Sequence, residues 1–316
     1  MVSALAALAA TQHSVFTRQQ ALAAGYHPSA IDRRLRSGGW LRLRHGIYAD
    51  RALEPIERHR YEVAAALLAL RDPTLVASRF SAARLHRLDF LVPPPVGVDL
   101  AGPPPTGRRD LDRLVVRPAE LPSAHRGTAA GLPATTLART VIDCGRALPF
   151  LDGVVLADSA LRRGATRRSF QAVSTYCWNW SGMTSISRAV AFSDPGSESV
   201  LESVCRVVFA RGGLPPPHTQ VTLGSHTGLI GRVDFYWPEL ATVAEADGRA
   251  KYVRPEDLWQ EKVREDRLRE AGMQVVRLTW AQALGDPDDC CARIRAAFGR
   301  SGSRRSPRAS AEQHQT

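Results

Sequence analysis

Hydrophobic positions in the first fifty residues recur at helical spacing three times and then alternate with basic residues. Residues 3–10 are rich in alanine and leucine, and the stretch Thr17-Arg18-Gln19-Gln20 has the form of a capping box that begins a second helix. Pro28 opens a third helix, which the glycines at 38 and 39 end. The alternating run WLRLRHGIYA then predicts a small β-hairpin. Three helices followed by a hairpin indicate a winged helix-turn-helix, which we assign to residues 1–52.

The predicted third helix separates apolar from basic positions. Ile31 and Leu35 lie four residues apart and share a face, whereas the arginines lie on the other faces. In a winged helix the third helix enters the DNA major groove, and the hairpin contacts phosphate. The alternative is that the basic residues only form a solvated surface. The candidate DNA-binding residues are Arg33, Arg34 and Arg36 of the helix and Arg42, Arg44 and His45 of the hairpin.

The pattern in residues 53–195 is mainly helical. Helical periodicity occurs in residues 54–71 and 81–88 and in the runs TTLARTVIDCGRAL and LDGVVLADSALRRG. Short strands are predicted at residues 96–100 and 114–117, beside a stretch rich in proline and glycine. We therefore expect an α-rich middle domain with short strands.

The pattern in residues 196–298 predicts the element order α-β-β-β-α-β followed by a last helix. The tail, residues 299–316, has almost no apolar side chains to bury, so we expect it to be disordered. The whole chain is thus predicted to belong to the mixed α/β (α+β) class. The expected helices are residues 199–211, 257–271 and 287–298, and the expected strands are residues 220–223, 230–237, 241–247 and 274–278.

Three carboxylates lie in or beside two of these predicted strands. If Glu239 and Leu240 form the turn, Asp234 lies directly opposite Glu245 with Cβ atoms about 5 Å apart. Asp247 lies two residues after Glu245 and so shares its face. Carboxylates so close repel one another unless a proton or cation lies between them. A hard divalent ion, Mg²⁺ or Mn²⁺, bound by Asp234, Glu245 and Asp247, satisfies this requirement.

The alternative for these carboxylates is an exposed acidic hairpin without a metal. Its charges would then be balanced by Arg232, Arg249 or Lys251.

Composition separates the two ends of the chain. The 316 residues carry a net charge of +11, which favours polyanionic partners and nucleic acid above all. Residues 1–195 hold 25 basic against 15 acidic residues, whereas residues 196–298 hold 13 basic against 15 acidic. The attraction for DNA is therefore expected in residues 1–195, and the three carboxylates lie in residues 196–298.

Several function classes have no support in the sequence. The five cysteines lack the spacing of a metal site, and their odd number argues against a disulfide scaffold. They are as expected for a protein of the reducing cytosol. Residues 1–10 lack the basic start of a secretory signal, and the longest apolar run, residues 63–70, is too short to span a bilayer. GxSxG, P-loop and GxGxxG motifs are absent from the sequence. We expect a cytoplasmic protein without a membrane partner.

The stretch TRQQALAAGYHPSAIDRRLRSGGWLRLRHGIYA closely resembles the N-terminal domain of AbiEi-type antitoxins of type IV toxin–antitoxin systems. The resemblance covers roughly the first fifty residues. It implies a winged helix that binds operator DNA, and it raises a cognate toxin as a candidate partner.

The stretches SVLESVCRVVFARGGLPPP, GRVDFYWPELATVAEADGRAKY and EKVREDRLREAGMQVVRLTW resemble a Vsr-like endonuclease domain of the PD-(D/E)XK superfamily. The resemblance implies that Glu202 is the helical acid of the site, and that Asp234 and Glu245 are its strand acids. Asp247 stands where the superfamily's acid-x-Lys pattern has lysine, so Lys251 or Lys262 would supply the ammonium group.

Two functions follow from these resemblances. The first is a DNA-binding protein whose metal-dependent endonuclease-like domain hydrolyses DNA phosphodiesters in defence or repair, with Glu202, Asp234, Glu245, Asp247 and Lys251 as catalytic residues. The second is an antitoxin-like transcriptional regulator whose nuclease fold is inactive.

Overall fold

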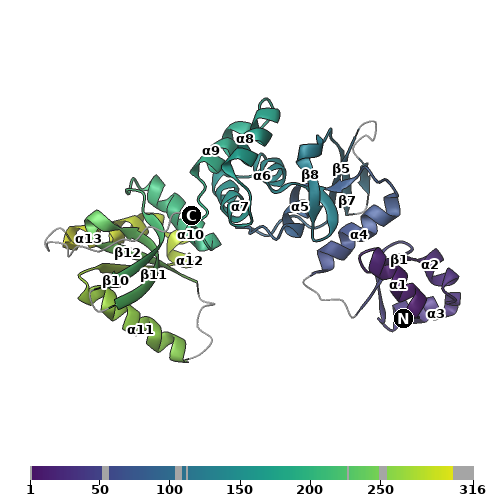
Figure 1. Ribbon diagram of the computed structural model, residues 1–316, viewed down its shortest axis with the longest axis horizontal. Helices are drawn as coiled ribbons and strands as arrows, with labels where there is room; N and C mark the ends of the chain where they lie inside the picture. Colours follow the sequence, from purple (N-terminus) through teal and green to yellow (C-terminus); the bar gives the residue numbers. More distant parts are fainter. Residues whose placement is uncertain are drawn as a thin grey trace. The chain divides into compact units, whose positions relative to one another are not determined.

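The computed structural model describes residues 2–51, 57–103, 109–111, 113–225, 228–248 and 255–301 (Figure 1). Among these residues helices combine with three separate sheets, which confirms the mixed α+β class. The contacts divide the chain into two compact units, residues 1–156 with 163–191 and residues 157–162 with 192–316. The domain boundaries expected at residues 52, 195 and 298 stay predictions.

The first unit begins with the predicted winged helix. The capping box at Thr17 is confirmed, because its side chain accepts a bond from Gln20 N while the Gln20 side chain accepts one from Thr17 N. The hairpin turns at His45 and Gly46, as predicted. A short additional strand pairs with the hairpin and gives the sheet order β1-β3-β2. The elements are α1 (Ser3–Thr11), β1 (Val15–Thr17), α2 (Arg18–Ala23), α3 (Pro28–Arg36), β2 (Trp40–Arg44) and β3 (Ile47–Asp50).

An aromatic core fixes helix α3 against the hairpin. Trp40 at the start of β2 packs edge-on against Phe16 of β1, with ring centroids 4.8 Å apart. Ile31 of α3 is fully buried in the same cluster, and Leu35 packs against it. The apolar face predicted for this helix is thus confirmed, and it decides which of the helix's arginines reach the surface.

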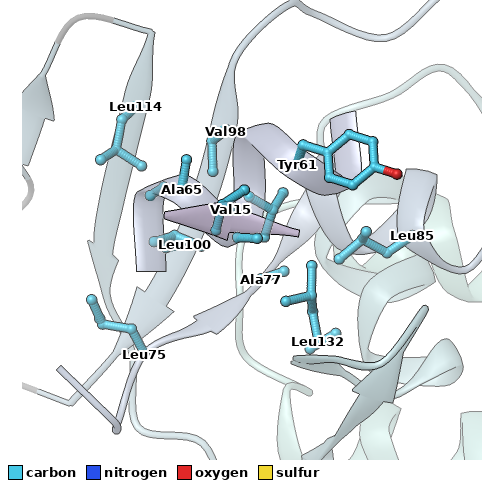
Figure 2. Close-up of a cluster of buried hydrophobic side chains, with 14 of the residues drawn as sticks. Val15, Tyr61, Ala65, Leu75, Ala77, Leu85, Val98, Leu100, Leu114 and Leu132 are labelled. Carbon is cyan, nitrogen blue, oxygen red and sulfur yellow. The ribbon is translucent and has the colours of Figure 1, made fainter. Parts of the chain in front are cut away.

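A second core joins the winged helix to the middle part of the chain (Figure 2). Val15 of β1 and Ile47 of β3 pack in one cluster with Tyr61 of α4 (Arg58–Leu70) and with Leu100 and Leu132 of the middle sheet. Burying such side chains stabilises the fold by about 1.5–3 kcal/mol each. Residues 2–50 therefore share a hydrophobic core with the part that follows them.

The middle part contains more sheet than the sequence predicts. Six strands form one sheet in the order β6-β7-β5-β4-β9-β8. The two predicted strands are present as β5 and β7, and the other strands are only two to four residues long, too short to show an alternating pattern. The strands are β4 (Val76–Ala77), β5 (Val98–Gly102), β6 (Arg109–Leu111), β7 (Leu114–Pro118), β8 (Arg126–Ala129) and β9 (Leu132–Thr135). The helices after α4 are α5 (Arg79–Leu85), α6 (Leu137–Gly145), α7 (Phe150–Arg162), α8 (Arg167–Tyr176) and α9 (Met183–Phe192).

The second unit has the predicted order α-β-β-β-α-β. Its sheet has the order β10-β11-β12-β13, in which only β12 and β13 run parallel. Helix α11 contacts β11 and β13, and Figure 1 shows α13 on the other side of the sheet. The elements are α10 (Val200–Arg211), β10 (His218–Ser225), β11 (Gly228–Trp237), β12 (Thr242–Asp247), α11 (Pro255–Glu270), β13 (Gln274–Thr279), α12 (Trp280–Gly285) and α13 (Pro287–Ser301).

The strand register in this unit agrees with the prediction, but the turn does not. Phe235 pairs with Ala244 and Trp237 with Thr242, which is the register that sets Asp234 against Glu245. The predicted two-residue turn at Glu239 and Leu240 is wrong, because Pro238 begins a short 3₁₀ helix and Ala241 completes the turn with φ 40°. Helix α13 also continues past the expected end at residue 298, to Ser301.

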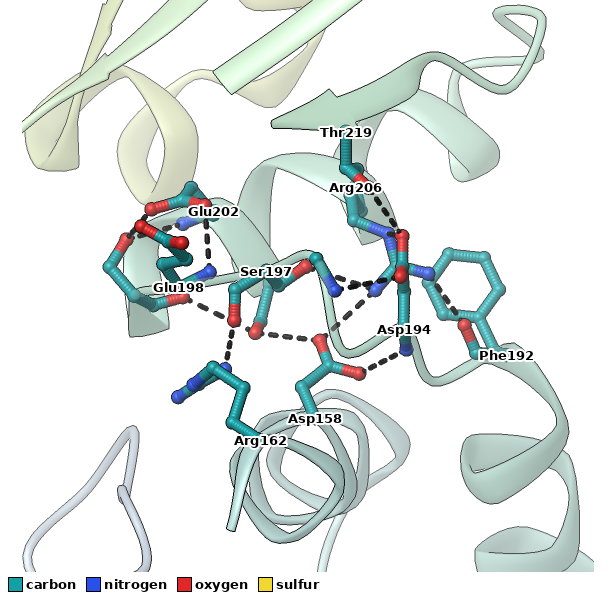
Figure 3. Close-up of polar contacts among 12 residues, drawn as sticks. Asp158, Arg162, Phe192, Asp194, Ser197, Glu198, Glu202, Arg206 and Thr219 are labelled. Carbon is teal, nitrogen blue, oxygen red and sulfur yellow. Dashed lines mark hydrogen bonds and ion pairs between the residues drawn. The ribbon is translucent and has the colours of Figure 1, made fainter. Parts of the chain in front are cut away.

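A buried polar network holds the end of helix α7 in the second unit (Figure 3). Asp158 is fully buried and accepts bonds from Ser203 Oγ at 2.7 Å, Arg206 Nη1 at 3.0 Å and Asp194 N at 2.7 Å. Burial raises the pKa of Asp158, whereas Arg206 acts in the opposite direction. The guanidinium of Arg206 also donates to Phe192 O at 2.6 Å. These bonds connect α7, the chain after α9 and α10.

Candidate nucleic-acid interface and acidic site

The basic residues of the winged helix fall into two groups according to their exposure. Arg33 and Arg36 of α3 are exposed, as are Arg42 and His45 of the hairpin. Arg34 is half-buried, with its guanidinium 5.6 Å from the ring centroids of both Tyr26 and Trp40. Such cation–π contacts contribute about 0.5–2 kcal/mol. Arg34 thus packs on the aromatic core, and Arg44 is also half-buried.

A hollow lies where α3 meets the hairpin, and three arginines line it. Its volume is about 470 Å³, and its walls include Arg36, Arg42 and Arg51 beside Leu35 and Trp40. Guanidinium groups recognise phosphate with paired N–H donors, so this hollow suits a polyanion backbone. Arg51 was not among the predicted residues, because it follows the alternating run that identifies the hairpin.

Glu202 and Asp234 meet through one side-chain amide in the second unit. Glu202 lies in the first turn of α10, where Ser199 caps the helix, and Asp234 lies on β11. Gln220 Nε2 donates to Glu202 Oε2 at 2.8 Å and to Asp234 Oδ1 at 3.2 Å. Both carboxylates are buried, at 4% and 9% exposure. The structure therefore brings these two predicted site acids together, one from α10 and one from β11, with an amide between them.

Gln220 adopts an uncommon backbone conformation, with φ 54° in the middle of β10. A non-glycine residue in the left-handed region costs of order 1–3 kcal/mol and persists only where its surroundings hold it. The two carboxylate bonds of the Gln220 side chain provide such a constraint. Strain of this kind concentrates at functional sites.

Burial and the neighbouring carboxylate act together on Glu202. Desolvation raises its pKa, and the charge of Asp234 raises it further. Bonds from Ser199 Oγ at 2.7 Å and from Glu198 N at 2.8 Å act in the opposite direction. Glu202 is thus a carboxyl group that takes up a proton more readily than an exposed glutamate does.

Asp234 and Glu245 also have separate partners. Asp234 Oδ2 accepts a bond from Ala246 N at 2.8 Å, across the β11–β12 pair. Glu245 Oε2 accepts a bond from Arg264 Nη2 of α11 at 3.0 Å. Arg264 also donates from Nη1 to Arg232 O at 2.6 Å. An amide, a backbone N–H and a guanidinium therefore offset the charge repulsion expected among these acids.

Asp247 lies further along β12, near a second arginine. Its Oδ2 is 3.9 Å from Arg277 Nη1, and Arg277 Nη2 donates to Glu265 Oε2 of α11 at 2.6 Å. Lys262 is exposed on α11, and Lys251 lies outside the described residues, as does Arg249. Arg232, named as an alternative partner for the acids, pairs instead with Glu198 at 2.6 Å. Gln220, Arg264 and Arg277 were not predicted, because no sequence pattern distinguishes them from other polar residues.

The donor chemistry of this acidic site fits Mg²⁺, but not as a closed cage. In the part of the chain that the structure describes, no three or more His, Cys, Asp or Glu side chains are grouped so as to hold a metal ion. Mg²⁺ commonly takes only one or two carboxylates and completes its shell with water and phosphate oxygens. Asp234 and Glu245 are the two carboxylates that could meet that smaller requirement, and an ion there would have to replace Arg264 at Glu245.

Comparison with known proteins supports the N-terminal prediction. Residues 3–49 match the family described as "Transcriptional regulator, AbiEi antitoxin", which confirms that resemblance for the winged helix. The uncharacterized proteins Rv2248 and MT2308, from two strains of Mycobacterium tuberculosis, are each 28% identical over 265 residues, covering 84% of this chain and 94% of the relative. The crystal structure of the RV2827C protein from Mycobacterium tuberculosis is 17% identical, with a TM-score of 0.37, over 60% of this chain and 80% of that one. The Vsr-like resemblance of the second unit stays a prediction.

Among the described residues, no helix has the length and apolar character needed to cross a membrane.

Proposed function

We propose that this chain, whose residues 3–49 match the AbiEi antitoxin regulators, binds DNA through its winged helix and hydrolyses DNA phosphodiesters through its second unit, in defence or repair. The observation that carries the proposal is the hollow between α3 and the hairpin, lined by Arg36, Arg42 and Arg51. In winged helices the third helix enters the major groove while neighbouring basic residues hold phosphate. DNA is thus the partner that this surface fits.

The arginines of α3 have different roles in this proposal. Arg33 and Arg36 are exposed and are the candidates for contacts with base edges. Arg34 stacks on Tyr26 and Trp40, so it fixes the angle of α3 rather than reading a base. Arg42 and Arg51 beside the hollow are the candidates for phosphate contacts.

Binding to a labelled duplex from upstream of the chain's own gene tests this division by fluorescence anisotropy. Arg33→Ala should weaken binding to the preferred sequence by about 1–3 kcal/mol and relax its specificity. Arg42→Ala should weaken binding to all sequences alike and reduce the salt slope by about one unit. Arg168→Ala is the matched control, since Arg168 is exposed on α8, away from the winged helix. Equal affinities for all three variants and the wild type would exclude the winged helix as the DNA-binding surface.

Hydrolysis is favoured by the buried acids of the second unit. Gln220 holds Glu202 and Asp234 together, and the raised pKa of Glu202 suits it to hold or pass on a proton. Arg264 of α11 lies beside Glu245 and Arg277 of β13 lies beside Asp247, and both would attract phosphate oxygens. Asp234 and Glu245 would hold Mg²⁺ or Mn²⁺, and Asp247, at the next position on the same face, lies beside Arg277 instead. Such an ion, when bound, supplies an activated water and stabilises the leaving oxygen.

Cleavage assays on supercoiled, linear and mismatched DNA, with Mg²⁺, Mn²⁺ or chelator, test the second half of the proposal. The wild type should cut only with metal, and Asp234→Asn should abolish cutting while DNA binding persists. Asp266→Asn, an exposed acid of α11 with 58% side-chain exposure, is the matched control and should cut normally. If the wild type binds DNA but cuts none of these substrates, the alternative holds. The chain is then an antitoxin-like transcriptional regulator with an inactive nuclease fold and a cognate toxin as the partner to seek.

A further inference from the structure

A cavity that is open to solvent, with a volume of about 370 Å³, lies at the surface of the first unit, beside the core that joins the winged helix to the middle sheet. The turn that follows α1 forms one wall through Gln12 and His13. Helix α4 and the chain around β9 form the others. This volume falls within the range of about 300–1,000 Å³ that is usual for small-molecule sites.

The walls of the cavity are mainly apolar, and its polar groups are few. Ala64, Leu67, Leu68, Leu75, Leu132 and Pro133 supply the apolar surface. Leu75 and Leu132 are labelled in Figure 2, where they lie at the edge of the shared core. Apolar walls with a small number of placed polar groups are the usual composition of a ligand site.

The charged and titratable groups around the cavity favour an anion. Arg71, at the end of α4, contributes a cationic side chain. Burial lowers the pKa of His13, and the charge of Arg60 lowers it further, so this ring is a neutral donor or acceptor. Asp72 also lines the cavity, but its Oδ1 accepts bonds from Thr74 N at 2.9 Å and Thr74 Oγ1 at 2.5 Å. That carboxylate is engaged in its own turn, and Arg71 is the charge available to a ligand.

The backbone around the cavity is held in uncommon conformations. His13 and Ser14 are consecutive non-glycine residues with φ of 57° and 68°. Ala130 and Gly131, with φ of 50° and 81°, form the two-residue turn between β8 and β9, where positive φ is ordinary hairpin geometry. A left-handed residue such as His13 outside a hairpin turn costs of order 1–3 kcal/mol and persists only where its surroundings hold it. His13 lines the cavity, so this constrained backbone lies at the cavity wall.

We propose that the cavity is a binding site for a small apolar carboxylic acid. The hydrocarbon part of the acid would leave water and pack against Leu67, Leu68 and Leu132, and its carboxylate would pair with Arg71. Because the turn after α1 forms one wall and α4 and β9 form the others, a ligand in the cavity touches both the winged helix and the middle part. Ligand binding should therefore alter DNA affinity, a consequence that rests on the proposed function.

Isothermal titration of octanoate into the full chain, without DNA, tests the site itself. Octanoate should bind saturably with one molecule per chain, and Arg71→Asn should weaken binding at least tenfold. Asparagine tolerates the left-handed backbone that Arg71 adopts with φ 52°. Arg87→Asn is the matched control, because Arg87 is also exposed and has φ 57° but does not line the cavity. Leu68→Trp, which fills the cavity, should abolish binding, and circular dichroism checks that the variants fold.

The proposal is overturned if octanoate shows no saturable binding at millimolar concentration, or if Arg71→Asn and Arg87→Asn bind it equally well. The link to DNA is then tested by anisotropy with and without saturating octanoate. A several-fold change in the DNA dissociation constant that Arg71→Asn removes supports the link, and an unchanged constant overturns it. Failure of the wild type to bind DNA without octanoate is a separate result, which counts against the winged-helix proposal alone.

Discussion

Arg264→Met tests whether the acids of the second unit form a cation site. Arg264 donates to Glu245 at 3.0 Å, and the two side chains are 29% and 12% exposed. Breaking a fully buried pair costs about 3–5 kcal/mol, and an exposed pair contributes about 0–1 kcal/mol. This half-buried pair lies between them, so we expect Arg264→Met to cost about 2 kcal/mol. Methionine keeps much of the apolar stem of arginine, so the loss reports mainly on the charge.

A double-mutant cycle separates the pair from the rest of the site. Glu245→Gln alone should cost less, because Arg264 is free to turn its guanidinium toward water. The double variant Arg264→Met with Glu245→Gln should recover about 1–2 kcal/mol of the loss, since no buried charge is left uncompensated. Differential scanning calorimetry resolves the melting of the second unit from that of the first. A change of 2 kcal/mol corresponds to roughly 6–8 °C in its melting temperature.

Metal addition completes the test. A cation that binds at Glu245 has to replace Arg264, so Arg264→Met should bind Mg²⁺ or Mn²⁺ more tightly than the wild type does. At 100 times the dissociation constant, binding adds about 2.7 kcal/mol of stability. The double variant serves as the control and should gain less. An Arg264→Met melt that equals the wild-type melt in chelator and does not rise with metal would refute this reasoning.

Three further predictions concern single contacts. Because the pKa of Glu202 is raised, its protonated form contributes stability at low pH, and this contribution is lost as the pH rises through that pKa. Glu202→Gln cannot ionise, so its melting temperature should rise relative to that of the wild type between about pH 4 and pH 8. A gain that is the same at every pH would contradict the assigned titration. Thr17→Ala removes the capping box that Thr17 forms with Gln20 and should destabilise the first unit by about 1 kcal/mol in calorimetry, with Thr17→Ser retaining most of it. Asp158→Ala removes the α7 carboxylate from the Arg206 guanidinium, a side chain that is only 10% exposed. The free energy of unfolding of the second unit should then fall by about 3–5 kcal/mol, and a fall of under 1 kcal/mol would count against the network.

The parts of the fold that followed from the sequence are those governed by local periodicity. Ile31 and Leu35 fixed the buried face of α3, and Thr17 with Gln20 fixed the start of α2. The register that opposes Asp234 and Glu245 also agrees with the prediction, although the assumed turn at Glu239 and Leu240 was wrong, because the actual turn of residues 238–241 has the same centre.

The parts that did not follow depend on contacts between distant elements. Arg264 looks like any other charge on a solvated helix, and only the packing of α11 brings it to Glu245. Gln220 begins a predicted strand, and nothing in its neighbours signals a left-handed backbone. The middle sheet escaped prediction because a strand as short as β4, with two residues, is stabilised by its neighbours rather than by its own pattern.

The position of Asp158 sets a limit on how this chain divides into interchangeable modules. A piece that begins at residue 196 contains every strand of the second sheet, yet it lacks the carboxylate that Ser203 and Arg206 bind. Recombination or cloning at that point would leave a buried guanidinium without its partner, whereas a piece that begins ahead of α7 keeps the pair intact. A piece meant to carry the second unit with its buried ion pair satisfied should therefore begin ahead of α7, near residue 150.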